Sequence, residues 1–515
     1  MKISLKRNFA YGLADDIRSP KGNGMTKHFD ILSNPGRLTP YRSTEADHAT
    51  NAGATGAKTF NIQDFQLALA GLLYGLGVNG SGYPKVLRKA DPTTGNWLAS
   101  DGSNAATAIG EGNATAIRGS FIEWASNWWG FQGTNQIWKV LTSTGVITNS
   151  HATVGSTIVT VAQSVVGADG NMYMFYNNQV VRVSSAGTVT DAAMTAIPSD
   201  MRITSACRWG SYLAIACAYG TSATATPAGR SQLYIWDYVS TTTVTDIIDF
   251  GEGALNVIGN IEGKICGVSD KYLSSTLGLG RGSMVVRMWG GGVPKVMKEL
   301  IANQTVTLGR FIRNVVIKDN TMYWVASVPF NQSTATESTF HLGIWSFGRK
   351  NKDTDFALSL DYVEEGVDTS NFKINSFGNA GNYWFINHSA DGSISKTDDA
   401  ANYTFTSIYE TPILDGGNAY LVKKPIEAVV TYAPLPTAGQ VVLKYRINAE
   451  TSYTTLSTYT TDNAISHATT SVESSGVFLP EHYEIQFRVE STGGAEITDF
   501  IYDYDVLNPA KIGQR

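Results

Sequence analysis

The chain has 515 residues, of which 43% are hydrophobic and 16% charged, with 51 glycines and a formal net charge of −5. A small negative charge argues against a protein that coats nucleic acid through bulk positive charge. Many glycines and few charges favour short strands joined by polar turns over helical bundles. The low charge also suggests that neighbouring subunits cover part of the surface. No apolar run reaches the length of a signal peptide or a membrane span, so we expect a protein that is made in the cytoplasm and stays soluble.

The first 60 residues form a polar segment that contains Pro20, Pro35 and Pro40. Its hydrophobic residues show little periodicity, so the segment alone could not bury enough apolar surface to offset the entropy lost on ordering. We therefore predict an extended N-terminal arm over 1–60. It would lie along the rest of the protein, or order on assembly by tying adjacent subunits or an adaptor together.

Residues 61–412 contain short strands that recur along the chain, several of them ending near a tryptophan. Trp138, Trp236, Trp289 and Trp345 mark this pattern, and the last three are 53 and 56 residues apart. A period of roughly 40 to 55 residues built from strands is typical of propeller blades. We predict a β-propeller over 61–412 with about seven blades, six or eight being the alternatives. The recurring tryptophans are expected to pack the repeated core.

The blades are expected where runs of apolar and β-branched residues are bounded by turn residues. The pair Asn177-Asn178 fits a two-residue hairpin because asparagine tolerates a positive φ. By residue number, the expected units cover 62–89, 116–140, 158–183, 203–238, 254–289, 311–347 and 372–408.

After residue 412 the pattern changes to strict alternation of apolar and polar residues. This period of two indicates strands with one buried face, and about 95 residues is a common size for an antiparallel sandwich. We predict a C-terminal β-sandwich over 413–515, so that the fold class is all-β. The expected strands are 425–432, 440–447, 453–456, 482–489 and 497–504.

The sequence contains none of the common catalytic motifs. There is no Gly-x-x-x-x-Gly-Lys-Ser/Thr loop, no His-Glu-x-x-His pair and no Gly-x-Ser-x-Gly elbow. The three cysteines lack metal-site spacing and are expected as free thiols, and Gly290-Gly291-Gly292 is expected as a turn between strands. We expect a protein that is not an enzyme, and we assign no catalytic, cofactor-binding or metal-binding residue. The residues considered and set aside include seven single histidines, His28, His48, His151, His341, His388, His467 and His482.

Two pairs of acids and one pair of aromatics leave alternatives open. Glu364-Glu365 and Asp398-Asp399 could bind cations or serve as glycosidase carboxylates, although adjacent acids on loops are usually solvated. Trp128-Trp129 could stack on a sugar. Neighbouring side chains on a strand face opposite ways, so at least one of these two indoles is expected in the core.

One segment near the N-terminus carries a resemblance to a known family. The run Phe29-Asp30-Ile31-Leu32-Ser33-Asn34-Pro35-Gly36-Arg37-Leu38-Thr39-Pro40-Tyr41-Arg42 stands before a glycine-rich propeller pattern and a terminal β-domain. In this order of parts the chain resembles the nozzle, or tail-tube, proteins of short-tailed bacteriophages. The resemblance implies a structural protein without catalytic residues, without cofactors and without membrane insertion.

The resemblance also implies an assembly. Proteins of this class form a ring, usually of six copies, beneath the head-to-tail adaptor, and the ring continues the DNA channel. We therefore expect a homo-hexamer in the virion tail, assembled in the host cytoplasm, that contacts the adaptor and tail fibre proteins and lets double-stranded DNA pass during ejection. The alternative is a receptor-binding or fibre-attaching propeller that uses exposed aromatics such as Trp128 or Trp129. A hydrolase with an unrecognised site is a third possibility that no residue favours.

Overall fold

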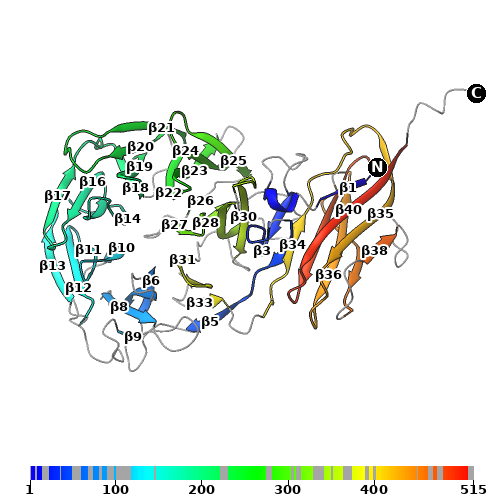
Figure 1. Ribbon diagram of the computed structural model, residues 1–515, viewed down its shortest axis with the longest axis horizontal. Helices are drawn as coiled ribbons and strands as arrows, with labels where there is room; N and C mark the ends of the chain where they lie inside the picture. Colours follow the sequence, from blue (N-terminus) through cyan, green and yellow to red (C-terminus); the bar gives the residue numbers. More distant parts are fainter. Residues whose placement is uncertain are drawn as a thin grey trace, which may run out of the picture. The chain divides into compact units, whose positions relative to one another are not determined.

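The computed structural model describes residues 2–5, 8–13, 23–34, 36–48, 60–67, 73–79, 84–89, 98–99, 117–143, 147–220, 230–273, 281–302, 307–308, 315–328, 341–349, 352–363, 374–388, 394–397, 402–448, 450–461, 468–471 and 479–507. Within these ranges every regular element is a β-strand except one short 3-10 helix, η1 (Asn8–Tyr11) (Figure 1). The chain is therefore all-β, as predicted.

The chain divides into two compact units, each built from separate stretches of sequence. Unit 1 comprises 1–43, 330–366 and 398–515, and unit 2 comprises 44–329 and 367–397. The polypeptide consequently passes from one unit to the other four times.

Unit 2 consists mainly of small antiparallel sheets of four strands, arranged one after another along the chain. Five of them are simple meanders, in which each strand pairs with the next in sequence. Their strands are β6 (Phe60–Leu67), β7 (Leu73–Asn79), β8 (Pro84–Lys89) and β9 (Leu98–Ala99); β10 (Ile117–Trp124), β11 (Asn127–Gln132), β12 (Gln136–Leu141) and β13 (Ile147–Thr153); β14 (Val161–Val166), β15 (Met172–Tyr176), β16 (Gln179–Val183) and β17 (Val189–Met194); β18 (Met201–Trp209), β19 (Tyr212–Tyr219), β20 (Arg230–Trp236) and β21 (Asp246–Glu252); β22 (Ala254–Ile261), β23 (Lys264–Leu273), β24 (Arg281–Trp289) and β25 (Lys295–Ala302).

Two further groups of strands complete the described part of unit 2. In the first group β26 (Thr307–Leu308) and β27 (Val315–Lys318) both pair with β28 (Thr321–Val328). The second is a four-stranded sheet in the order β31-β32-β33-β5. Its strands are β31 (Ile374–Ala380), β32 (Tyr383–His388), β33 (Ile394–Thr397) and β5 (Thr44–His48), so its last strand comes from the start of the unit.

The core of unit 2 lies between consecutive sheets. Separate apolar clusters join the β6–β9 sheet to the β10–β13 sheet, the β10–β13 sheet to the β14–β17 sheet, and so on to β22–β25. Another cluster joins the β31-β32-β33-β5 sheet back to the first sheet, through Phe65, Leu73 and Phe385. Because each sheet has a neighbour on both faces, strands such as β15 are buried at every residue. This succession of small sheets is consistent with propeller blades.

Unit 1 contains two larger sheets around one core. The first has the order β1-β40-β35-β38, with β1 (Lys2–Ser4), β40 (Ile497–Leu507), β35 (Val422–Tyr432) and β38 (Ala468–Ser471). The second joins β29 (His341–Gly348), β30 (Ala357–Val363), β2 (Met25–Lys27), β34 (Ser407–Glu410), β39 (Ile485–Thr492), β36 (Gln440–Ile447) and β37 (Thr454–Tyr459). A small hairpin, β3 (Phe29–Asp30) with β4 (Thr39–Pro40), accompanies them. One apolar cluster draws side chains from both sheets, including Val430, Leu443, Phe487 and Phe500.

Most expected strands are present, with differences in where some of them pair. The strand expected at 440–447 matches β36, and Asn177 has a φ of 49° in the hairpin between β15 and β16. In contrast, β34 lies in the stretch expected as propeller but pairs with β2 and β39 within unit 1. Alternation shows that a strand has a buried face, but it does not show which sheet the strand joins.

The described part of the N-terminal segment is built into the fold. β1 pairs with β40, β2 lies between β30 and β34, and β5 pairs with β33. The neighbouring strands supply the hydrogen bonds and apolar surface that the segment lacks by itself.

Candidate functional site

A cavity of about 400 Å³ lies among the first strands of the sheets of unit 2. It is lined by residues that include Phe65 on β6, Gln163 on β14, Cys207 on β18, Gly259 on β22, Lys318 on β27 and Asn379 on β31. Figure 1 shows these strands toward the middle of the unit, with β13, β17, β21 and β25 at its periphery. Six stretches far apart in sequence therefore meet at this cavity.

Two glycines allow the strands around the cavity to approach closely. A Cβ atom on Gly259 would lie 2.5 Å from Cδ1 of Ile317, and one on Gly378 would lie 2.6 Å from Cβ of Phe65. Both distances are far below van der Waals contact. The wall of the cavity at these points is therefore bare backbone packed against the next sheet.

The polar groups of the cavity wall are few, and most are already engaged. The ammonium of Lys318 donates to the carbonyl oxygen of Gly381 at 2.7 Å, and Nδ2 of Asn379 donates to the carbonyl oxygen of Tyr383 at 3.0 Å. The amide oxygen Oε1 of Gln163 is buried and accepts no hydrogen bond within the described structure. Burial raises the pKa of the Cys207 thiol to about 12, so this group is not a thiolate at neutral pH. No carboxylate or histidine is among the described residues of the wall.

The size of the cavity limits what it can admit. Pockets for small molecules commonly measure about 300–1,000 Å³, and the volume of this cavity lies within that range. The cavity is therefore of a size that could accept a small molecule.

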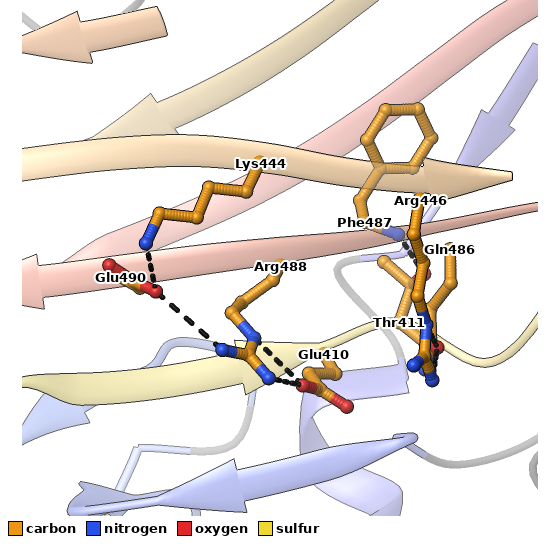
Figure 2. Close-up of polar contacts among 8 residues, drawn as sticks. All are labelled: Glu410, Thr411, Lys444, Arg446, Gln486, Phe487, Arg488 and Glu490. Carbon is orange, nitrogen blue, oxygen red and sulfur yellow. Dashed lines mark hydrogen bonds and ion pairs between the residues drawn. The ribbon is translucent and has the colours of Figure 1, made fainter. Parts of the chain in front are cut away.

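A second polar constellation lies on the sheet of unit 1 formed by β34, β39 and β36 (Figure 2). Nε and Nη2 of Arg488 donate to Oε1 of Glu410 at 2.8 and 2.6 Å, and both side chains are almost fully buried. Lys444 Nζ lies 2.7 Å from Oε1 of Glu490, which is 3.8 Å from Nη1 of Arg488. The ring of Tyr453 lies 4.1 Å from the guanidinium of Arg488, the separation of a cation–π contact.

Neighbouring hydrogen bonds fix this constellation in place. Arg446 donates twice to Oε1 of Gln486, at 2.9 and 2.6 Å, and Gln486 donates to the carbonyl oxygen of Thr411 at 2.7 Å (Figure 2). Burial raises the pKa of Glu410, and the positive charge of Arg488 acts in the opposite direction. The charges of the constellation are paired, although Oε2 of Glu410 and the hydroxyl of Tyr453 are buried without a hydrogen bond in the described structure. We assign the constellation a structural role.

Another buried carboxyl lies near the N-terminal segment of unit 1. Tyr41 donates its hydroxyl to Oδ2 of Asp361 at 2.9 Å, and Asp361 is buried on β30. Burial, and to a smaller extent the charge of Asp30, raises the pKa of Asp361 to about 7. Ser346 and Ser359, a directly opposed pair on β29 and β30, share this environment.

The two tryptophans considered as a sugar platform are both buried. Trp128 contributes to the cluster between the first two sheets, and Trp129 contributes to the cluster on the other face of its own sheet. The sugar-stacking interpretation of this pair is therefore wrong, because consecutive side chains on β11 fill two different interfaces. The recurring Trp138, Trp236, Trp289 and Trp345 are likewise buried, as predicted.

The other residues singled out from the sequence do not converge on a site. Gly290-Gly291-Gly292 lies between β24 and β25, and Nε1 of Trp289 donates to the carbonyl oxygen of Gly292 at 2.9 Å. Cys207, Cys217 and Cys266 are free thiols. The acidic pairs 364–365 and 398–399, and His467, lie outside the described residues. Of the other six histidines, the described side chains are those of His28, His151 and His482.

The described residues contain neither a candidate metal site nor a helix that could cross a membrane. No group of three or more His, Cys, Asp or Glu side chains in the described ranges is arranged to hold a metal ion. In the same part of the chain, no helix has the length and apolar character needed to cross a membrane.

No sequence pattern pointed to Asp361 or to the Glu410–Arg488 pair. Both acids lie on short strands, and alternation would place their side chains toward solvent. The covering segments, such as 23–26 and the residues around Tyr453, come from distant parts of the chain.

No protein-family model matches this chain, and no curated protein matches it. Several solved structures are similar in their backbone. One is the β-propeller domain of Cps50 (Swd1) from Myceliophteria thermophila, with a TM-score of 0.41, 10% identity, and coverage of 67% of this chain and 99% of that one. Another is an exo-β-1,3-galactanase from Phanerochaete chrysosporium, with a TM-score of 0.33, 10% identity, and coverage of 90% and 100%.

A third similar structure is the extracellular domain of a hybrid two-component system from B. thetaiotaomicron, with a TM-score of 0.38 and 12% identity. The match covers 77% of this chain but only 44% of that one. These proteins differ in function from one another, and the expectation that this chain is not an enzyme stays a prediction.

Proposed function

We propose that this chain is a structural protein of a bacteriophage tail, of the nozzle or tail-tube kind. Six copies would form a ring that continues the DNA channel below the head-to-tail adaptor, without catalytic activity. The ring would be assembled in the host cytoplasm and would contact the adaptor and tail fibre proteins. The proposal rests on the segment Phe29–Arg42 and on the order of parts that follows it.

The architecture that we propose is a seven-bladed propeller with a β-sandwich. Seven first strands, β6, β10, β14, β18, β22, β27 and β31, would be the inner strands of seven blades. The pairing of β33 with β5 supports a closed circle, because strands from both ends of unit 2 share one sheet. The core shared by the two large sheets of unit 1 supports the sandwich.

The single observation that carries the ring is the size of the cavity in unit 2. The cavity of about 400 Å³ among the inner strands has the size of a small-molecule pocket and would not itself serve as a channel for duplex DNA. A DNA conduit built from this chain would therefore need its channel on an axis shared by several copies.

The way the chain is threaded suits a load-bearing component. Four crossings between the units mean that a force pulling them apart would act on four covalent connections. A small net charge of −5 also suits a conduit, since each phosphate neutralised by the wall would add affinity and retard passage.

The receptor-binding alternative loses the feature that suggested it, because Trp128 and Trp129 are buried. One experiment distinguishes the tail conduit from the receptor-binding module. It measures the mass of the purified protein in solution and records negative-stain images of the protein alone and mixed with tail components. We expect a ring of about six copies with a central hole, alone or on an adaptor. A stable monomer that ignores tail components but binds host glycans would overturn the conduit and support the receptor-binding module.

A further inference from the structure

The strands around the cavity of unit 2 each have one edge without a strand partner in the described structure. β14, β18 and β22 pair only with β15, β19 and β23, and β6, β27 and β31 likewise pair with one neighbour each. Such an edge presents backbone N–H and C=O groups that can bind another polar molecule. Some of these groups are already used, since the amide of Ile258 donates to Oγ of Ser205 at 3.2 Å. The others remain outside the ladders of the sheets.

The residues of the cavity wall come from similar positions on these strands. Gln163 lies three residues before the end of β14, and Cys207 and Gly259 lie two residues before the ends of β18 and β22. Phe65 lies two residues before the end of β6, and Asn379 one residue before the end of β31. The cavity is therefore a product of the repeated sheets, because each sheet contributes the same part of its first strand.

Lys318 is the one charged residue among the described residues of the wall. Its ammonium donates to the carbonyl oxygen of Gly381 at 2.7 Å and lies 5.8 Å from the centre of the Trp384 ring. Neither contact neutralises the charge. Asp319, the next residue in the chain, is exposed in the turn after β27 and is not part of the wall. One cation without an acid gives the cavity a positive potential, which favours an anionic ligand.

Two neutral amides complete the polar part of the wall. Gln163 and Asn379 are both partly exposed, and the hydrogen bond from Asn379 to the carbonyl oxygen of Tyr383 fixes one of them. Oε1 of Gln163 is buried and accepts no hydrogen bond in the described structure. A buried acceptor without a donor is costly, so turning this amide toward a donor in the cavity would remove the cost. Hydroxyl groups suit amides and strand edges alike, because a hydroxyl both donates and accepts.

We propose that the cavity of unit 2 binds a small organic anion that also carries hydroxyl groups, of the size of a sugar acid. Lys318 would hold the carboxylate, while Gln163, Asn379 and the unpaired strand edges would hold the hydroxyls. The volume of about 400 Å³ suits one such molecule. The inference is independent of the tail proposal, because the whole site lies within one copy of the chain.

The test titrates the full chain at about pH 6 with three sugars of similar size, glucuronate, glucose and glucosamine. They are anionic, neutral and cationic under these conditions. We expect glucuronate to bind at least tenfold more tightly than glucose, and glucosamine to bind most weakly. Added salt should reduce the difference, because it screens the charge of Lys318. Isothermal titration calorimetry measures the three affinities.

Variants of Lys318 locate the anion. Lys318→Met removes the charge and keeps an unbranched side chain, so this variant should bind glucuronate no more tightly than glucose. Lys318→Arg should keep the preference for glucuronate. The matched control is Lys295→Met, at an exposed position of β25 outside the wall, which should bind like the unchanged protein. Circular dichroism checks that each variant is folded, and Lys318→Gln takes the place of Lys318→Met if that variant is not.

Three results would overturn the proposal. Equal affinity of the unchanged protein for the three sugars would show that the cavity does not select an anion. The absence of binding at millimolar concentrations of all three would show that it takes no ligand of this class. A preference for glucuronate that survives the loss of the Lys318 charge would place the anion elsewhere on the chain.

Discussion

Gly378 on β31 lies directly against Phe65 on β6, although 313 positions separate them in the sequence. A Cβ atom on Gly378 would lie 2.6 Å from Cβ of Phe65, and the next nearest atoms belong to the same phenyl group and to Leu73. Phe65 is fully buried, so it has little room to move away. The absence of a side chain at position 378 is what lets the last sheet of unit 2 pack on the first.

Gly378→Ala should therefore destabilise unit 2. Inserting one methyl group into a packed core typically costs about 1–3 kcal/mol. Urea unfolding followed by tryptophan fluorescence would measure the loss. Gly290→Ala is the matched control, because a Cβ there would meet only the flexible side chain of Lys264. Equal stability of both variants would show that the two sheets are not in close contact.

The buried carboxyl of Asp361 predicts a specific dependence of stability on pH. Its pKa is raised to about 7 in the folded protein, from an ordinary value of 3.8. The folded state therefore holds a proton that the unfolded state has lost, and stability should fall as the pH rises from about 4 to about 7. Below and above this window the group contributes no further change.

Asp361→Asn should remove that part of the pH dependence. The variant should gain stability relative to the unchanged protein as the pH rises through the window, because the amide stays neutral and can still accept from Tyr41. Denaturant unfolding at both ends of the window measures the difference. Asp353→Asn, at an exposed position of the same unit, should show no such gain. A parallel shift at all pH values would contradict the assignment.

The pair Glu410–Arg488 predicts a marked difference between single and double substitutions. Arg488→Met alone would leave the Glu410 carboxylate buried without its partner, at a cost of about 3–5 kcal/mol. Adding Glu410→Leu removes the stranded charge, so the double variant should recover much of that loss. Unfolding of the four proteins of this cycle gives the coupling free energy. Lys444→Met is the control: its ion pair with Glu490 is more exposed and should matter less.

Sequence patterns predicted where many of the strands lie, but they did not predict which strands pair with one another. Alternation located β36 and the hairpin at Asn177, because each depends on residues within one short stretch. The recurrence of Trp236, Trp289 and Trp345 indicated repeated small sheets for the same reason. The buried polar groups depend on what covers them: Glu410 is buried by segments more than 40 residues away, and no local pattern carries that information. The N-terminal segment illustrates the same limit, since its strands β1 and β5 pair with β40 and β33 from distant parts of the chain.

The pairing of β5 with β33 predicts that a disulfide can link the two ends of unit 2. Thr44 and Thr397 are directly opposed on these strands. The variant Thr44→Cys with Thr397→Cys should therefore oxidise readily, whereas Cys207, Cys217 and Cys266 stay reduced, because burial keeps them as neutral thiols. A bond that closes a loop of several hundred residues should stabilise the protein by up to about 5 kcal/mol relative to its reduced form. Mass spectrometry of peptides identifies the bond, and unfolding with and without reductant measures the gain. Thr44→Cys alone provides the control and should show no effect of reductant. If the two cysteines fail to form a disulfide in the folded protein, β5 does not pair with β33 as described. The proposal that the blades form a closed circle would then be wrong.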